Sequence, residues 1–217
     1  MRRAAAVVDL AAIRGNLERI RGLAGNATVM AGVKADAYGH GMAPVARTAR
    51  RAGAEWLGVA LPSEALALRA QGDEGRILAW LWAPGDSDIA ACVRADVDLS
   101  VSSTWAVDDV VEAARRVGRR ARVHIKVDTG LSRNGATAEQ LPHVLTRVVD
   151  AMVEGVLEVE GIWSHLADGD TPDAPSVSEQ HERFEVALDE ADAAGIRPRL
   201  RHLANSGALF AHPECHY

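Results

Sequence analysis

Aromatic residues, cysteines and long apolar runs are scarce in this sequence, and each scarcity excludes a class of protein. Aromatic side chains make up only 4% of the 217 residues and the net charge is −6. Both values argue against a nucleic-acid partner, which favours stacking platforms and positive surfaces. No apolar run approaches the roughly 20 residues that span a bilayer, and Asp9 and Arg14 interrupt the apolar N-terminal stretch. Cys92 and Cys215 stand far apart, so we expect no disulfide framework and a reducing, cytoplasmic location.

The sequence does contain a repeated alternation of short apolar runs and amphipathic stretches. The runs are continuous rather than alternating, as parallel strands covered on both faces require. The seven expected strands are 28–33, 56–60, 76–82, 97–101, 121–127, 156–163 and 200–203. The expected helices are 11–23, 43–51, 63–70, 88–94, 105–117, 139–151, 177–194 and 206–210.

This order predicts an α/β fold, either an open doubly wound sheet or a (β/α)8 TIM-like barrel. No GxGxxG follows the first strand, and polar residues follow several strands. Both observations favour the barrel, whose functional residues gather at the carboxyl ends of many strands. Because a closed barrel needs eight strands and we find seven, we expect the last strand to be missing.

A lysine and two glycines follow the first expected strand, in the segment VKADAYGHG at residues 33–41. At the mouth of a barrel, burial lowers the pKa of a lysine and makes it a usable amine. Lys34 is therefore a candidate for a Schiff base or an acid/base group. The alternative is an ordinary surface lysine followed by a turn.

The fifth expected strand leads into HIKVDTGLSRNG at residues 124–135, which places Lys126, Asp128 and Arg133 at the same barrel end as Lys34. A salt-bridged strand end is the alternative reading. The Asp-Thr-Gly triplet also occurs in aspartic proteases, but these need two carboxylates that share a proton. No second triplet is present, so we set the protease reading aside.

Histidines end the last two expected strands, at His165 and His202. Each is either a catalytic group or a hydrogen-bonded core residue. Asn205 and Ser206 follow, where they can cap the next helix or bind a phosphate at its N-terminus. The segment HPECH at residues 212–216 matches no structural zinc spacing, so we expect a polar loop there and no metal site.

Taken together, five segments resemble the bacterial alanine racemases in order and spacing. Residues 31–41 are similar to the cofactor-lysine motif VKANAYGHG, and residues 59–72 to the helix VAxxEEAxxLRxxG. The other three segments and their family motifs are 124–135 (HxKxDTGMxRxG), 161–167 (G[IL]x[ST]H[FL]A) and 202–208 (HxANSxA). The departures from the family pattern are Asp36, Ser63 and Leu131.

The resemblance implies a fold-type III enzyme that uses pyridoxal 5′-phosphate to interconvert L-alanine and D-alanine, supplying D-alanine for peptidoglycan. It implies that Lys34 holds the cofactor as an internal aldimine and then serves as one of two acid/base groups on the α-proton. Tyr38 and Ser206 are implied to contact the phosphate. Arg133 is implied to lie near the phenolic oxygen of the cofactor and the substrate carboxylate.

By the same resemblance, His165, His202 and Asn205 lie around the cofactor ring. In many relatives the lysine that matches Lys126 is carbamylated and helps to hold the arginine that matches Arg133. Lys126 is therefore a candidate for this modification.

Two parts of the family pattern have no match here. The second acid/base group of the family is a tyrosine from the C-terminal β-domain of the partner subunit, and the RPGxxxYG segment supplies the eighth strand. We therefore expect residues 1–217 to be the cofactor-binding barrel domain, without the C-terminal β-domain, of a longer two-domain enzyme that forms a homodimer. Alone, this chain is expected to be inactive or weakly active.

Two other functions remain open at this point. The pyridoxal-phosphate homeostasis proteins are non-enzymatic, of similar length and built on a related barrel, but they typically lack a tyrosine at the position of Tyr38. Another fold-type III enzyme, such as a broad-specificity racemase or a D-threonine aldolase-like protein, is also conceivable, although the aldolases need a metal site that the sequence does not offer.

Overall fold

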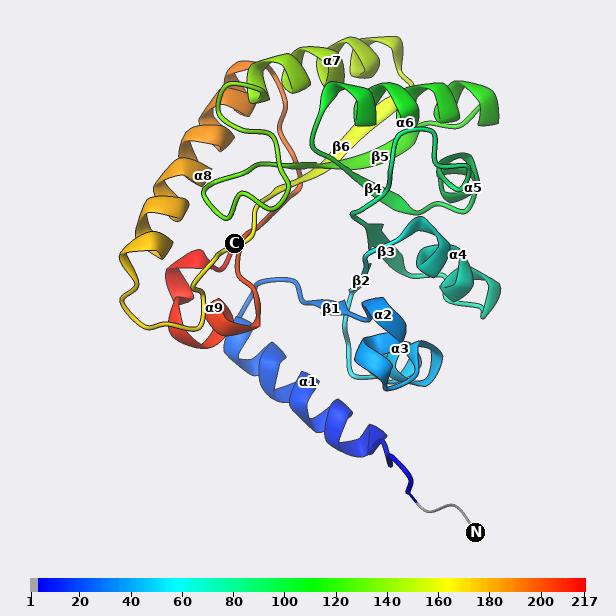
Figure 1. Ribbon diagram of the computed structural model, residues 1–217, viewed down its shortest axis with the longest axis vertical. Helices are drawn as coiled ribbons and strands as arrows, with labels where there is room; N and C mark the ends of the chain where they lie inside the picture. Colours follow the sequence, from blue (N-terminus) through cyan, green and yellow to red (C-terminus); the bar gives the residue numbers. More distant parts are fainter. Residues whose placement is uncertain (1–3) are drawn as a thin grey trace.

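Seven parallel strands form one curved sheet in the computed structural model, which describes residues 4–217 (Figure 1). Each strand pairs with the next along the chain, in the order β1-β2-β3-β4-β5-β6-β7. The strands are β1 (Met30–Gly32), β2 (Trp56–Val59), β3 (Arg76–Ala79), β4 (Asp98–Val101), β5 (Ala121–Lys126), β6 (Leu157–Trp163) and β7 (Leu200–His202).

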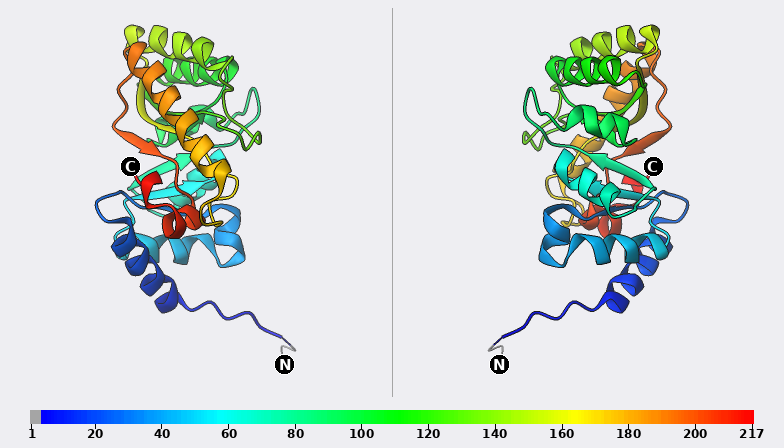
Figure 2. Two further views of the ribbon diagram at one scale, coloured as in Figure 1. Left: turned by 90° about the vertical axis from the view of Figure 1, so that its left-hand side faces the viewer. Right: turned by 90° about the vertical axis from the view of Figure 1, so that its right-hand side faces the viewer.

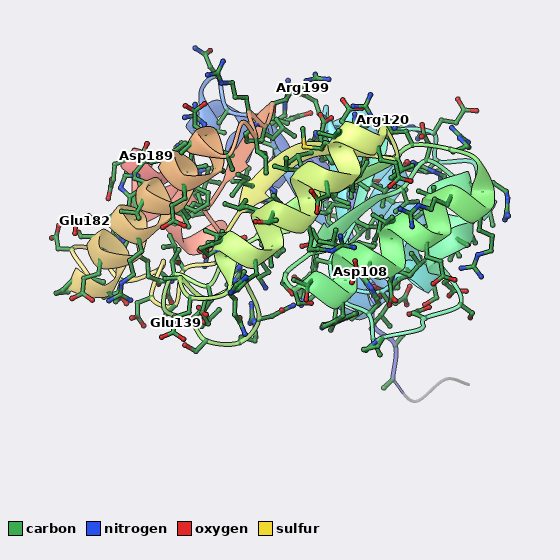
Figure 3. All side chains as sticks on the ribbon, turned by 90° about the horizontal axis from the view of Figure 1, so that it is seen from above. Asp108, Arg120, Glu139, Glu182, Asp189 and Arg199 are labelled. Atoms are coloured by element: carbon green, nitrogen blue, oxygen red, sulfur yellow. The ribbon has the colours of Figure 1, made fainter. Side chains whose placement is uncertain are left out.

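Helices connect the strands and lie on the outside of the curved sheet (Figure 1). They are α1 (Leu10–Ala24), α2 (Lys34–Gly39), α3 (Met42–Arg51), α4 (Pro62–Ala70), α5 (Ile89–Arg94), α6 (Thr104–Val117), α7 (Leu141–Glu154), α8 (Pro175–Ala193) and α9 (Ser206–Ala211), with a 3₁₀ turn at Pro213–Cys215. Charged side chains such as Asp108 of α6 and Asp189 of α8 project from the outer helices (Figure 3).

The expected TIM-like barrel with one strand missing is confirmed. Within residues 4–217, β1 pairs only with β2 and β7 only with β6, so the sheet curls without closing. Every expected strand is present, with ends within three residues of the prediction. Both faces of the sheet are covered, which explains why the strands read as continuous apolar runs.

The amino ends of the strands hold a network of paired charges. Asp98, fully buried at the start of β4, accepts hydrogen bonds from Arg76 at 3.0 and 2.7 Å and from Arg122 at 2.5 Å. The buried Glu160 lies 3.3 Å from Arg76. Charges taken out of water are tolerated when they are paired in this way, so this end of the barrel is electrostatically balanced.

Helix α1 and the segment before it lie to one side of the barrel. Residues 4–9 lead away from the body as extended chain (Figure 2). Asp9 caps α1, since its carboxylate accepts from the backbone N–H groups of Ala11 and Ala12 at 2.8 and 3.1 Å. Among the described residues, no helix combines the length and apolar character needed to span a membrane.

The segment after β1 is where the structure departs most from the expected loop. Four consecutive residues, Ala35 to Tyr38, have φ between 51° and 57° and ψ between 35° and 52°. They form a left-handed turn, which costs L-residues about 1–2 kcal/mol each. The two glycines noted in the sequence do have positive φ, 83° at Gly39 and 89° at Gly41, but they only complete a turn that begins earlier.

Two carboxylates hold this turn in place. Glu64 of α4 accepts from the backbone N–H of Ala35 at 2.6 Å, and Asp36 accepts from the backbone N–H of Met42 at 2.6 Å. Ala37, the third residue of the turn, is buried. The turn therefore fixes the direction in which Lys34, its first residue, leaves the sheet.

We predict that Ala35→Gly raises the free energy of unfolding by about 0.5–1 kcal/mol, because glycine adopts the left-handed conformation without strain. The methyl group of Ala35 is exposed, so little packing is lost. Chemical denaturation measures the change. The matched control is Ala12→Gly in the right-handed helix α1, which we expect to lower the same free energy by about 0.5–1 kcal/mol. A loss of stability in both variants would contradict the strained turn.

Candidate active site

Four of the predicted site residues come together at the carboxyl ends of the strands. His165, half-buried at the end of β6, has its pKa lowered to about 4 by burial and by the positive charges of Arg133, Lys126 and Lys34. Lys34 and Arg133 come from the segments that follow β1 and β5, and Lys126 is the last residue of β5. The structure thus joins Lys34, Lys126, Arg133 and His165 as the sequence predicted.

Lys126 is the most buried of the cations, with 4% of its surface exposed. Burial and the charge of Arg133 lower its pKa to about 8, while Asp128 opposes the shift. The Lys126 Nζ lies 4.5 Å from the centre of the Trp163 ring, and such a cation–π contact offsets part of the cost of desolvation. About a tenth of this amine is therefore neutral near pH 7.

Lys34 is half-buried and lies next to Tyr38, with its Nζ 5.2 Å from the centre of the phenol ring. The Tyr38 side chain is 62% exposed. A Cβ added to Gly32 would lie 3.8 Å from the Tyr38 hydroxyl, so the left-handed turn folds the phenol back over the end of β1. The hydroxyl group is therefore presented at the mouth of the barrel.

Arg133 sits on a small loop that is closed at its base. The backbone of Ala136 returns to β5, donating to the Lys126 carbonyl at 2.9 Å and accepting from the Asp128 N–H at 2.9 Å. The Asp128 carboxylate accepts from the N–H groups of Gly130 and Ser132 at 3.0 and 2.9 Å. Asp128 therefore shapes the loop, and its Oδ1 does not serve as a partner for the nearby cations.

His202 is held by two aromatic neighbours. Its ring stacks on Trp163 with centres 5.3 Å apart and planes 7° apart, and its Nε2 lies 2.9 Å from Nδ1 of His124. Burial lowers the pKa of His202 to about 3. A Cβ at Gly161 would lie 2.3 Å from His124, so this glycine makes room for the histidine pair inside the barrel.

Asn205 caps α9, as one of its two predicted roles requires. Its Oδ1 accepts from the backbone N–H of Ala208 at 3.0 Å, and its Nδ2 donates to the Leu166 carbonyl at 3.2 Å. The amide thus ties the start of α9 to the segment after β6. Ser206, the first residue of the helix, is exposed beside it.

Several residues with a part in this site were not singled out from the sequence. Glu64 occupies the second glutamate position of the VAxxEEA segment, and His124 opens the HIK segment, so a signal for both was present. Trp163, which stacks on His202, and Gln180 of α8, which donates to the His165 carbonyl at 3.1 Å, carried no signal that distinguished them from core residues. Their roles depend on contacts between elements far apart in the chain.

Comparison with known proteins agrees with this arrangement. A family model described as alanine racemase, N-terminal domain, matches residues 8–217. The chain belongs to this family. It is 51% identical to the alanine racemase of Frankia casuarinae over 215 residues, which cover 99% of this chain and 56% of that protein.

Solved structures of the family have the same fold. The alanine racemase of Streptomyces lavendulae superposes with a TM-score of 0.95 at 46% identity, covering 97% of this chain and 55% of that one. The alanine racemase of Bacillus anthracis, solved with bound L-Ala-P, gives 0.83 at 31% identity, covering 93% of this chain and 52% of that one. The chain thus spans about half the length of the alanine racemases it matches.

The lowered histidine pKa values predict that the protein loses stability in mild acid. The unfolded chain binds protons on histidine below about pH 6.5, whereas the pKa values of folded His165 and His202 are about 4 and 3. Between these limits the free energy of unfolding decreases as the pH is lowered, by up to about 1.4 kcal/mol per pH unit for each histidine.

Denaturation at a series of pH values checks this prediction. We expect His202→Gln to flatten the slope between pH 6.5 and 4 by up to about 1.4 kcal/mol per pH unit. The matched control is His143→Gln, which removes an exposed histidine of α7 from the same protein. An unchanged slope in His202→Gln would show that the folded ring binds its proton over the same pH range as the unfolded one, and would contradict the lowered pKa.

Proposed function

We propose that this protein carries pyridoxal 5′-phosphate on Lys34 and interconverts L-alanine and D-alanine. The observation that carries the proposal is the grouping of Lys34 with Lys126, Arg133 and His165 at one end of the barrel, in a chain of the alanine racemase family. The Bacillus anthracis relative with bound L-Ala-P supports a site for an alanine-like ligand. By this proposal the protein is a cytoplasmic isomerase that supplies D-alanine for the cell wall.

The donor set fits an anionic cofactor. Burial and the positive charges of Arg133, Lys126 and Lys34 together lower the pKa of His165, so these cations set a positive potential around that ring. The carboxylate of Asp128, two residues after Lys126, accepts hydrogen bonds from the backbone of its own loop. A group that brings a phosphate, a phenolate and a substrate carboxylate into this region would relieve the repulsion.

We assign the contacts residue by residue. Tyr38 and Ser206 present hydroxyl groups to the phosphate, and Arg133 presents its planar donor fork to the phenolic oxygen and the substrate carboxylate. His165, His202 and Asn205 line the ring. When bound, the cofactor supplies an electron sink that stabilises negative charge at the α-carbon of the substrate.

Lys34 is the acid/base group on one face of the substrate. Its Nζ leaves the sheet from the left-handed turn, in a half-buried position beside Tyr38. A neutral amine there accepts the α-proton, and the resulting ammonium returns it.

Lys126 is proposed to be carbamylated. Its pKa of about 8 provides the neutral amine, which attacks carbon dioxide, forms an N–C bond and loses one proton. The product is an anionic carbamate where a buried cation stood before. Its oxygens can accept hydrogen bonds from Arg133, which helps to hold that side chain in place.

Residues 1–217, of which the structure describes 4–217, form one cofactor-binding barrel domain. Racemisation needs an acid/base group on each face of the substrate, and we place the second in the portion of the relatives that this chain does not match. That group is expected from the partner subunit of a homodimer.

Reductive trapping tests the assignment of Lys34. The sequence contains only two lysines, Lys34 and Lys126, so the competing amines are few. We expect borohydride treatment with pyridoxal 5′-phosphate to label the peptide that contains Lys34, and Lys34→Ala to lose both the label and the cofactor absorbance. The matched control, Lys126→Met, keeps the label on Lys34. Labelling of Lys34→Ala at the same level would refute the assignment.

Proton exchange at the α-carbon tests the activity without requiring the second acid/base group. We expect the protein with cofactor to exchange the α-proton of one enantiomer of alanine in D₂O faster than that of the other, because Lys34 reaches one face. Proton NMR measures the loss of signal, and Lys34→Ala abolishes it. D-alanine formation from L-alanine is expected near background for this chain. Robust turnover would mean that a residue within this chain acts as the second base.

A further inference from the structure

Gln180 of α8 is a buried polar side chain, with 2% of its surface exposed, although glutamine usually lies at the surface. Its Nε2 donates to the Thr129 hydroxyl at 3.0 Å and to the His165 carbonyl at 3.1 Å. Its Oε1 accepts from the backbone N–H of Ala167 at 2.9 Å. One side chain therefore joins the segment after β5 to the segment after β6.

The neighbouring groups fix the orientation of this amide. The Ala167 N–H can only donate, and the His165 carbonyl can only accept. A flipped amide would face each of them with the wrong atom, and a carboxylate would lack the donor that the carbonyl needs. The contacts at Gln180 therefore require an amide in one orientation.

A directed chain of hydroxyl groups extends from this amide. The Ser164 hydroxyl donates to the Val127 carbonyl at 2.8 Å, so its single proton is committed. The Thr129 hydroxyl, 2.8 Å from Ser164 Oγ, must then donate to it. Thr129 in turn accepts from Gln180. Hydrogen bonds that run in one direction strengthen one another, and the loss of one end weakens the whole chain.

The loop that carries Arg133 is attached to the protein at this point. Its base is closed at Val127 and Ala136. From α8, Arg183 donates to the Thr129 carbonyl at 3.0 Å, one turn after Gln180. Helix α8 thus holds the loop through both the hydroxyl and the carbonyl of one residue.

We propose that Gln180 is a positioning residue that sets the Arg133 loop against His165. It touches Thr129 at one end of the link and His165 at the other. Arg133 and His165 therefore keep a fixed separation in the protein before any ligand is bound. The effect of Gln180 on cofactor binding rests on the proposed function, whereas its effect on the position of the loop does not.

Two substitutions at Gln180 and one in the loop test the proposal. Gln180→Met keeps the length of the side chain and removes all three hydrogen bonds, whereas Gln180→Glu keeps the shape and removes the donors. Thr129→Val removes the hydroxyl that accepts from Gln180 and leaves α8 unaltered. This variant replaces the first two if they fold poorly. The control is Glu182→Gln on the outer side of the same helix (Figure 3).

The first readout is the titration of the His165 ring by NMR in the protein without cofactor. Because Arg133 contributes to the low pKa of His165, a loosened loop lets that pKa rise toward 6.5, and we expect an upward shift of about one pH unit. The backbone N–H of Ala167 is expected to exchange with solvent about tenfold faster, as the loss of one hydrogen bond implies. Glu182→Gln changes neither value.

Cofactor affinity is the second readout. We expect the Kd for pyridoxal 5′-phosphate to rise about tenfold in Gln180→Met and Gln180→Glu, equivalent to the loss of one charge-assisted contact. A His165 titration that stays within 0.2 pH units (about 0.3 kcal/mol) of the parent, despite faster exchange at Ala167, would overturn the positioning role. If the parent protein does not bind the cofactor at all, the proposed function fails, and the His165 titration still decides the role of Gln180.

Discussion

Burial of the Lys126 amine close to Arg133 is the constraint on which the carboxyl end of this barrel depends. The parallel sheet brings Lys34, Lys126 and Arg133 to one end of the barrel, and Lys126, the buried one of the three, is the least screened by water. Burial and the neighbouring positive charges lower the pKa of His165 to about 4 and that of Lys126 to about 8. The remaining excess of positive charge makes this end of the barrel a place for an anion.

The two ends of the barrel handle charge in opposite ways. At the amino ends of the strands, Arg76 and Arg122 are matched by Asp98 and Glu160, and the network is balanced. At the carboxyl ends, the Asp128 Oδ1 accepts from the backbone of its own loop, and Asp128 only partly offsets the effect of burial and of Arg133 on Lys126. This contrast agrees with the general division of such barrels into a stabilising end and a functional end.

Rigid local structures carry the positive groups and hold them in place against their repulsion. Lys34 begins a strained left-handed turn anchored by Glu64. Arg133 sits on a loop closed by Asp128 and held from outside by α8. The cost of the strained turn and of the buried amide network is understandable if the geometry of these side chains matters more than the stability gained by relaxing them.

The sequence by itself determined the order of strands and helices, since continuous apolar runs and amphipathic stretches are local patterns. It also identified Lys34, Arg133 and His165 as residues at strand ends, because parallel strands place those ends together. Only the tertiary structure decided the left-handed turn, since Ala35 and Ala37 do not favour that conformation and contacts with Glu64 hold it. The same is true of Gln180, whose partners lie 13 to 51 residues away. Such contacts depend on how helices pack against the sheet, which a linear pattern does not specify.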